Sequence, residues 1–270
     1  MLLAILIIIF CIFLLYLYFK YFRILRINCL AMFTGAPKTG KSTLSVYTAV
    51  RLHKKQVRRT KLRNLILFWK PKLDLPLLYS NVPLNVPHVL VTDDLLTRKT
   101  RFVYGSVIYL GEVSLVSNSM SFSSNELNER ILMFYKLIGH ETKGGYLIVD
   151  TQSIQDVHYG IKRSISEYYH ILHCYKLPLC PFVLLKLKLL TYSEDNSSIN
   201  VNDTEADENT KFYLVPKKTW KVFDAYAYSF MTDNLPVVSN LNNSGSNSKF
   251  EVVSFNKYKT LYKGENYENE

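Results

Sequence analysis

The octapeptide GAPKTGKS, residues 35–42, constrains the fold of this chain more than any other segment. It matches the phosphate-binding pattern G-x-x-x-x-G-K-[ST] at every fixed position. The apolar run INCLAMFT precedes it and STLSVYTAVRLHKK follows it, so a buried strand, a tight turn and a helix are expected in that order. In such an arrangement the N–H groups of the turn and the helix N-terminus point at phosphate oxygens.

The residues of this motif have distinct predicted roles. Lys41 is expected to reach the β- and γ-phosphates of ATP, Ser42 to ligate Mg²⁺, and Thr43 to lie near the α-phosphate. The two glycines allow the turn to curl around the phosphates. The predicted nucleotide-binding set is Gly35, Ala36, Pro37, Lys38, Thr39, Gly40, Lys41, Ser42 and Thr43. ATP and Mg²⁺ are therefore the expected cofactors.

The N-terminal 19 residues carry no charge and consist almost wholly of Leu, Ile, Phe, Tyr and Ala. As a helix they would span about 28 Å, close to the thickness of the hydrocarbon layer. Lys20, Arg23 and Arg26 follow at once, and positive charge marks the cytoplasmic side. We therefore expect a single transmembrane helix over residues 1–20, with the N-terminus outside and the remainder in the cytoplasm. A cleaved secretory signal is disfavoured because no basic stretch precedes the apolar run and no small-residue cleavage site follows it.

The overall charge is strongly positive. Lys and Arg number 33 against 22 Asp and Glu, a formal net charge of +11, which favours contact with nucleic acid or anionic lipid. The densest basic run is HKKQVRRTKLRN, residues 53–64. Two interpretations stay open for this run: contact with lipid headgroups or a phosphate backbone, or the solvated end of the helix that begins at residue 42.

Nucleotide hydrolysis also needs an acidic residue at the end of a buried strand near the loop. The best match is GSVIYLGEV, residues 105–113, in which Glu112 is the predicted catalytic carboxylate. Gly111 stands where such strands usually carry Asp, so the contact to magnesium is missing or comes from another residue. Slow or absent hydrolysis of the nucleotide is therefore an alternative to an active ATPase. Asp150, near the end of GYLIVDTQ, is the rival catalytic residue and an alternative magnesium ligand.

Two further polar residues are candidates for the site. Gln152 follows Thr151 at the end of the apolar run 146–151, a position suited to a sensor of the γ-phosphate, although both residues also suit an ordinary strand end. Arg163 lies in a polar segment and is a candidate arginine finger, acting within its own chain or across a subunit boundary. The alternative for Arg163 is an isolated surface arginine.

Strand-like and helix-like segments alternate along the chain, which predicts an α/β fold with a mostly parallel sheet between helices. Ligands are then expected at the carboxyl ends of the strands. The predicted strands are 27–34, 77–82, 107–112 and 146–151, and the predicted helices are 42–57 and 126–138.

One globular nucleotide-binding domain is expected over residues 27–232. An acidic, exposed loop interrupts it at 193–211, and a low-complexity linker and tail follow at 233–270. The segments 168–192 and 211–230 flank that loop and are expected to form a β-rich subdomain.

Several stretches together resemble the Zot-like family, which includes the assembly ATPase of filamentous phages (inoviruses). The likeness covers residues 27–231, and the order of its motifs is more specific than each motif alone. The stretches that carry it are the loop at 35–42, LLYSNVPL at 77–84, VIYLGEV at 107–113, LIVDTQSIQDVHYGIKRSISEYYHI at 147–171, and KVFDAYAYSF at 221–230.

The resemblance implies a membrane-bound P-loop ATPase with an FtsK/HerA-like core, which helps to extrude phage DNA while coat subunits assemble around it. It implies that Lys41 and Ser42 bind nucleotide, Glu112 lies in the Walker B position, Gln152 is sensor-like and Arg163 is a finger. The chain departs from the family pattern at Gly111. It also places its apolar segment before the nucleotide-binding domain, whereas filamentous-phage members place their membrane helix after it.

The resemblance also implies the surroundings of the protein. The expected partners are the membrane, further copies of the chain, phage coat and assembly proteins, and single-stranded DNA. The expected location is the inner membrane of a host bacterium. Two alternatives stay open: an FtsK/HerA-like DNA translocase or conjugative coupling protein, and a scaffold that binds nucleotide without hydrolysing it.

Overall fold

The computed structural model describes residues 27–91, 93–96, 101–116, 126–176, 180–190 and 210–223, together with residues 9, 10, 12, 13, 16 and 25. The predicted transmembrane segment 1–20 and acidic loop 193–211 lie mostly outside the described residues, and the tail 233–270 lies wholly outside them. Within the described part of the chain, no helix combines the length and apolar character that a membrane crossing requires.

A mixed sheet of eight strands, in the order β3-β2-β4-β5-β1-β6-β7-β8, runs through the described chain. Neighbouring strands from β3 to β6 are parallel, and β7 and β8 are added antiparallel. The predicted mostly parallel α/β sheet is therefore confirmed. The strands are β1 (Leu30–Thr34), β2 (Leu78–Ser80), β3 (Val89–Leu90), β4 (Val107–Leu110), β5 (Tyr146–Thr151), β6 (Glu167–Lys176), β7 (Phe182–Leu190) and β8 (Thr210–Pro216).

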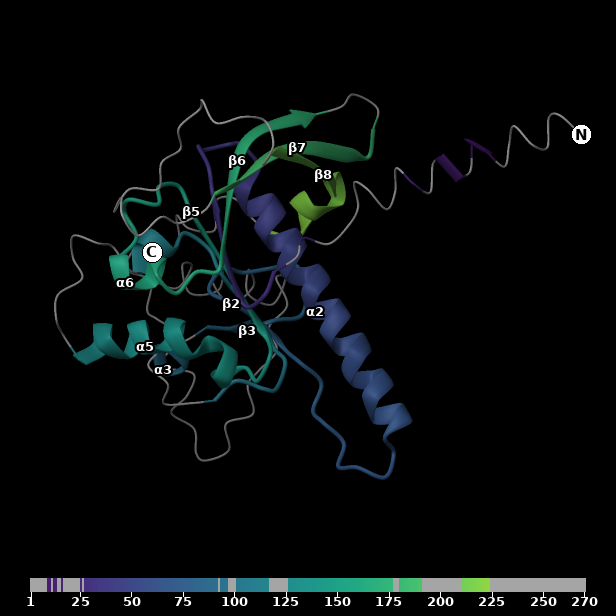
Figure 1. Cartoon of the computed structure of the whole chain (residues 1–270), viewed down its shortest axis with the longest axis vertical. Helices are drawn as coiled ribbons and strands as arrows, with labels where there is room; N and C mark the ends of the chain where they lie inside the picture. The colour runs from purple at the N-terminus through teal and green to yellow at the C-terminus, as the bar shows by residue number, and fades with distance from the viewer. Residues whose placement is uncertain are drawn as a thin grey trace, which may run out of the picture.

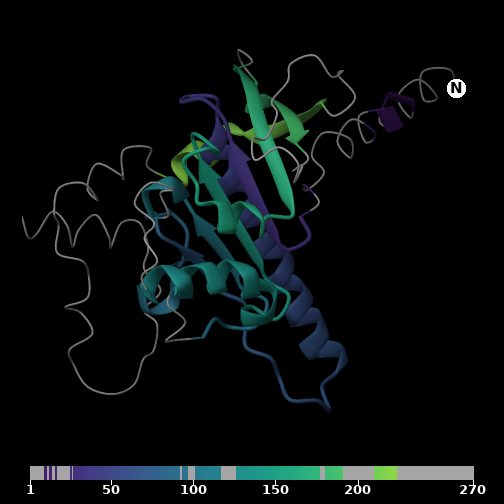
Figure 2. The same ribbon diagram turned by 60° about the vertical axis from the view of Figure 1, so that its left-hand side comes forward.

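Helices cover both faces of the sheet (Figures 1 and 2). Alternate residues of a strand point to opposite faces, so Phe33 of β1 packs in the cluster that contains Leu44 of α2, while Met32 packs with Phe134 of α5. The result is a three-layer sandwich. Its helices are α2 (Lys41–Ile66) on one face and α3 (Asp93–Leu96), α5 (Glu126–Glu141) and α6 (Tyr159–Lys162) on the other; α4 (Val113–Val116) follows β4 and a 3-10 helix, η2 (Lys217–Lys221), follows β8.

The first long helix extends further than predicted. It was expected over residues 42–57, but α2 continues to Ile66. No Gly or Pro interrupts residues 41–66, and the Lys, Arg and Leu residues of this segment favour helix. The basic run 53–64 is therefore the second half of α2.

The described strands of the predicted β-rich subdomain continue the main sheet. β6 pairs with β1 in parallel from Ala31↔Glu167 to Thr34↔His170, and β7 and β8 pair antiparallel beyond it. Ile171 of β6 and Leu185 of β7 join the same core cluster as α2. Burial of that apolar face against α2 is the physical reason for the continuation.

The ends of the parallel strands meet along one side of the sheet, here called the carboxyl edge. Thr34 ends β1 opposite Thr151 of β5, and β4 ends at Leu110 opposite Val149. The phosphate-binding loop and the segments that follow β4 and β5 therefore start side by side. The opposite side, where these strands begin, is called the amino edge.

The core makes a direct stability prediction at Phe33, which is fully buried and stacks on Tyr169 with ring centroids 5.2 Å apart. Phe33→Ala is expected to lower the free energy of unfolding by about 3–5 kcal/mol, because it leaves a cavity in the sheet–helix layer. Urea unfolding of the purified chain measures this change. Met133→Ala, at an exposed position of α5, is the matched control, and equal losses in both variants would contradict the assignment of the core.

Candidate nucleotide-binding site

The loop between β1 and α2 has a backbone that only glycine adopts easily at two positions. Gly35 has φ 154° and Gly40 has φ 87°. A Cβ at Gly35 would lie 2.8 Å from the Ile171 carbonyl oxygen, and one at Gly40 would lie 2.9 Å from Leu185 Cδ2. The loop therefore lies directly against β6 and β7, and the two glycines permit this close approach.

The donor set of the loop fits a phosphate group. Ala36, Pro37 and Lys38 are exposed, and the Thr39 hydroxyl donates to the Ala36 carbonyl at 2.7 Å, which closes the turn. α2 begins at Lys41 with Gly40 as its N-cap and has no acidic residue in its first turn. The N-terminal N–H groups of this long helix therefore carry partial positive charge toward the loop.

A magnesium ion would depend on Ser42 together with phosphate oxygens. The hydroxyl of Ser42, in the first turn of α2, is a hard oxygen donor of the kind that Mg²⁺ prefers. Among the described residues no three or more His, Cys, Asp or Glu side chains are grouped so as to hold a metal. The residues present thus suit a magnesium ion carried with a nucleotide rather than one held by a cage of protein ligands.

Lys41 and Glu112 form the charged centre of the site. Lys41 Nζ lies 3.0 Å from Glu112 Oε2, and the side chains are only 8% and 14% exposed. Lys41 comes from the start of α2 and Glu112 from the residues after β4, so the sheet brings together two groups 71 positions apart in the chain. The predicted phosphate-binding lysine and the predicted catalytic carboxylate are therefore in direct contact.

Several hydrogen bonds fix the position of Glu112. Its backbone is left-handed, with φ 47°, and its N–H donates to Asp150 Oδ1 at 2.7 Å. Its Oε1 accepts from the Ser114 hydroxyl at 3.0 Å and from the Gln152 N–H at 3.1 Å. Gln152, predicted as a sensor, thus contributes its backbone here, while the residue itself is exposed.

Asp150 lies behind Glu112 and is 1% exposed. Its Oδ2 accepts the Tyr109 hydroxyl at 2.9 Å, so each carboxylate oxygen has a protein donor. Burial raises the pKa of the Asp150 carboxyl above its ordinary value, and the nearby Lys41 ammonium and the two hydrogen bonds partly oppose that rise. This geometry suits Asp150 to positioning Glu112, and Glu112 is the carboxylate that contacts Lys41.

The backbone of Gly111 is hydrogen-bonded to the side chain of Asn81. Its N–H donates to Asn81 Oδ1 at 2.8 Å, and its carbonyl accepts from Asn81 Nδ2 at 3.0 Å. Asn81 follows β2, the neighbour of β4 in the sheet. This two-way contact ties the segment before Glu112 to the adjacent strand.

Sequence reasoning missed the roles of Tyr109, Asn81 and His170. His170 Nδ1 lies 2.9 Å from the hydroxyl of Thr34, the residue directly before the loop. Asn81 had a usable signal, because it is a polar residue at the end of a predicted strand. Tyr109 and His170 had none, because nothing in the local sequence distinguishes a strand Tyr or His that bonds to the site from one that only packs in the strand.

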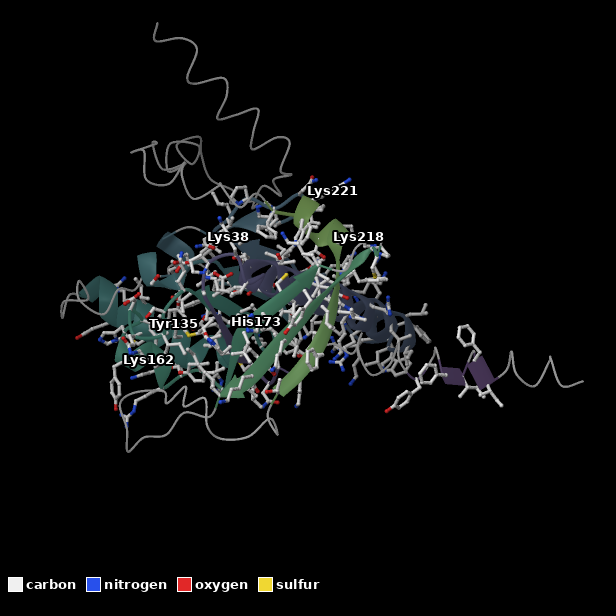
Figure 3. All side chains as sticks on the ribbon, turned by 90° about the horizontal axis from the view of Figure 1, so that it is seen from above. Lys38, Tyr135, Lys162, His173, Lys218 and Lys221 are labelled. Atoms are coloured by element: carbon white, nitrogen blue, oxygen red, sulfur yellow. The ribbon has the colours of Figure 1, made fainter. Side chains whose placement is uncertain are left out.

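Arg163 is the predicted site residue that the structure does not bring to the loop of its own chain. It follows α6 and comes shortly before β6 begins opposite Ala31, at the amino edge. Its guanidinium lies over the Tyr159 ring, 4.9 Å from the centroid. Figure 3 labels Lys38 in the loop and Lys162 beside Arg163, and the two lie well apart.

Three features together define a P-loop NTPase. They are the phosphate-binding loop between β1 and α2, its place at the carboxyl edge of the sheet, and the contact between Lys41 and Glu112. No protein-family model matches the chain, and no curated protein matches it in sequence. The class therefore rests on these features of the chain itself.

Solved structures give only distant likenesses. The N-terminal domain of zonular occludens toxin from Neisseria meningitidis aligns with a TM-score of 0.40 and 15% identity, over 74% of this chain and 100% of that one. The flagellar accessory protein FlaH from Methanocaldococcus jannaschii aligns with a TM-score of 0.40 and 15% identity, over 74% of this chain and 92% of that one. A third likeness is to the genome packaging NTPase B204 from Sulfolobus turreted icosahedral virus 2, in complex with ATP-gammaS. It aligns with a TM-score of 0.32 and 11% identity, over 56% of this chain and 78% of that one. All three TM-scores are below 0.5.

The buried carboxyl predicts a pH-dependent stability effect. Because its pKa is raised in the folded protein above 3.8, the folded state binds the proton more tightly than the unfolded state, and ionising Asp150 costs stability as the pH rises. Asp150→Asn keeps the shape and removes that charge. The variant is therefore expected to gain stability relative to the parent between pH 4 and pH 8, as measured by thermal unfolding.

Asp156→Asn, at an exposed carboxyl, is the matched control for this comparison. A stability difference between Asp150→Asn and the parent that stays constant or falls as the pH rises would contradict the dominance of burial at Asp150.

Proposed function

We propose that this chain is a membrane-anchored P-loop ATPase that drives filamentous phage assembly and the extrusion of phage DNA. The observation that carries the enzymatic part is the contact between Lys41 and Glu112 at 3.0 Å. A phosphate-binding lysine and a carboxylate able to activate water belong to the same small site, as phosphoryl transfer to water requires.

The residues of the chain account for the steps of hydrolysis. The loop binds the phosphates of ATP through backbone N–H groups, and Lys41 binds the β- and γ-phosphates. Glu112 polarises a water molecule and takes its proton as the water oxygen bonds to the γ-phosphorus and the bond to ADP breaks. The Ser42 hydroxyl would hold Mg²⁺, which would supply positive charge to the phosphates.

A network behind Glu112 keeps its side chain in place for this role. Asp150 holds the backbone N–H of Glu112 and is itself held by the Tyr109 hydroxyl. Ser114 and the Gln152 N–H hold Oε1. Oε2, the oxygen on the Lys41 side, is the one we assign to the attacking water. A preorganised carboxylate of this kind lowers the barrier because little rearrangement is needed during the reaction.

The membrane and phage parts of the proposal rest on the sequence. The uncharged residues 1–19 followed by Lys20, Arg23 and Arg26 support an inner-membrane anchor with the nucleotide site in the cytoplasm. The ordered set of motifs shared with the Zot-like family supports phage coat proteins and single-stranded DNA as partners. Arg163 lies away from the loop of its own chain, so an arginine-finger role would require a neighbouring copy in a homo-oligomer.

A non-hydrolysing scaffold is the second candidate, and a specific observation favours it. Gly111 supplies no acidic side chain, and both oxygens of Glu112 already have protein partners. In that case Glu112 would only hold Lys41 and the loop in place. The two functions differ in whether the parent chain releases phosphate from bound ATP.

Two substitutions separate binding from hydrolysis. Lys41→Ala is expected to abolish both nucleotide binding and phosphate release, because it removes the cation that holds the phosphates. Glu112→Gln is expected to keep nucleotide binding and to lower phosphate release by about 10²- to 10⁴-fold, the usual contribution of a general base. Binding is measured with a fluorescent ATP analogue and turnover by phosphate release.

Glu129→Gln, at an exposed position of α5, is the control for these variants. Absence of phosphate release in the parent chain, with intact nucleotide binding, would favour the scaffold. Unchanged turnover in Lys41→Ala would refute the site itself.

The assembly role predicts a phenotype in the bacterial host that carries the genome encoding this chain. The Lys41→Ala chain is expected to remain in the inner membrane, while release of filaments falls and coat protein and single-stranded DNA accumulate in the cell. Filaments counted in the medium and DNA extracted from the cells measure this effect. Normal filament release with the Lys41→Ala chain as the sole copy would refute the role in extrusion.

A further inference from the structure

The second half of α2 extends away from the rest of the described chain (Figure 1). Gln56 Nε2 donates to the Gly144 carbonyl at 3.2 Å, and Gly144 comes two residues before β5. Gln56 therefore marks the level of the amino edge. The ten residues that follow, 57–66, carry the helix about 15 Å beyond that edge.

The loop after the helix folds back against it. Asn64 Nδ2 donates to the Leu73 carbonyl at 2.8 Å, and the Leu73 N–H donates to Asn64 Oδ1 at 3.1 Å. His53 lies 3.1 Å from the Pro76 carbonyl oxygen, where the loop rejoins the domain. These contacts close residues 57–75 into one ordered projection, which we call the α2 tip.

Large apolar side chains are exposed at the α2 tip. Leu65 is 74% exposed, Phe68 76% and Trp69 64%, and Leu62 and Ile66 are also exposed. The Phe68 and Trp69 rings meet edge to face with centroids 5.2 Å apart. These five residues fall within eight positions, 62–69, at the end of a projection. Exposed apolar residues scattered singly over a surface are ordinary.

Positive charge surrounds this apolar end. Residues 54–72 contain eight Lys and Arg and no Asp or Glu. Arg58, Arg59, Lys61 and Arg63 lie on the helix just before or among the apolar residues, and Lys70 and Lys72 follow them; all six are exposed. An apolar end bordered by cations is complementary to a surface with an apolar interior and anionic headgroups.

We infer that the α2 tip inserts its apolar residues into the interface of an anionic lipid bilayer. Helices and loops that lie in the interface combine Trp, Phe and Leu on the buried side with Lys and Arg toward the headgroups. Trp and Phe would lie at the headgroup boundary, and the long stems of Arg58 and Arg59 would let their charges reach lipid phosphates.

The position of the tip agrees with the proposed N-terminal anchor, and in this respect alone the inference rests on the proposed function. The Cys29 carbonyl accepts from the Leu147 N–H just before β1 begins, so the chain enters the sheet at the amino edge. The tip extends beyond that same edge. The chain thus enters the sheet on the edge beyond which the tip extends, and the nucleotide loop lies on the opposite edge.

The apolar content favours lipid over nucleic acid. Aromatic and basic residues alone would also suit stacking on single-stranded DNA. Leu62, Leu65 and Ile66 offer no planar face for a base, yet each is exposed. Their exposure is explained by burial in acyl chains, which return the full hydrophobic contribution of these side chains.

The test uses the full-length chain with Trp220→Phe, which leaves Trp69 as the one remaining tryptophan. The chain is added to vesicles of brominated phosphatidylcholine, with or without brominated phosphatidylglycerol. Trp69 emission is expected to shift to shorter wavelength and to be quenched in the anionic vesicles, and markedly less in the neutral ones. Arg58→Glu with Arg59→Glu is expected to lower quenching in anionic vesicles to the neutral level.

Two matched controls accompany this experiment. A Trp69→Phe chain reports Trp220, which lies in η2 after β8 and outside the α2 tip, and its emission is expected to be unquenched. Lys218→Glu with Lys221→Glu makes the same charge change in η2, both residues being labelled in Figure 3, and is expected to leave Trp69 quenching unaltered.

Unquenched Trp69 in anionic vesicles would overturn the inference, as would equal quenching in both lipids. A shift of Trp69 emission with a single-stranded oligonucleotide and none with brominated lipid would assign the tip to nucleic acid instead. Phosphate release is measured on the same vesicles. If no phosphate is released, the proposed ATPase activity is contradicted. The Trp69 emission still decides whether the α2 tip inserts into lipid.

Discussion

The ion pair between Lys41 and Glu112 is the interaction on which the site depends. Both side chains are almost enclosed, and a charge in such surroundings needs a partner. The pair holds the first residue of α2 against the segment after β4, so the loop, the helix and the acidic residue have one fixed relation. A bound nucleotide would add negative charge beside Lys41, the residue that contacts Glu112.

A second layer keeps this pair in position. Asp150 occupies the strand between β1 and β4 and bonds to the backbone of Glu112 as well as to Tyr109. Asn81 holds Gly111 from the other side. The left-handed backbone of Glu112 is thus over-determined by neighbours on both flanking strands, which is how a strained residue persists at a functional site.

The two edges of the sheet have different proposed tasks. The carboxyl edge holds the nucleotide loop and Glu112, while the chain enters at the amino edge and the α2 tip extends past it. A single N-terminal anchor would leave the domain free to rotate about its tether. A second contact with the bilayer, joined to the nucleotide loop by one continuous helix, would fix the direction in which a change at the loop acts on the membrane.

The sequence by itself determined the loop, the strand and helix around it and the mostly parallel sheet, because these depend on residues close together in the chain. Glu112 was also found, since it ends an apolar strand. Only the tertiary structure decided that Asp150 lies behind Glu112 and that Asn81 is hydrogen-bonded to Gly111. It also decided that Arg163 lies away from the loop and that β6–β8 continue the main sheet. Those relations follow from strand order and register, which join residues tens of positions apart and leave no local pattern in the sequence.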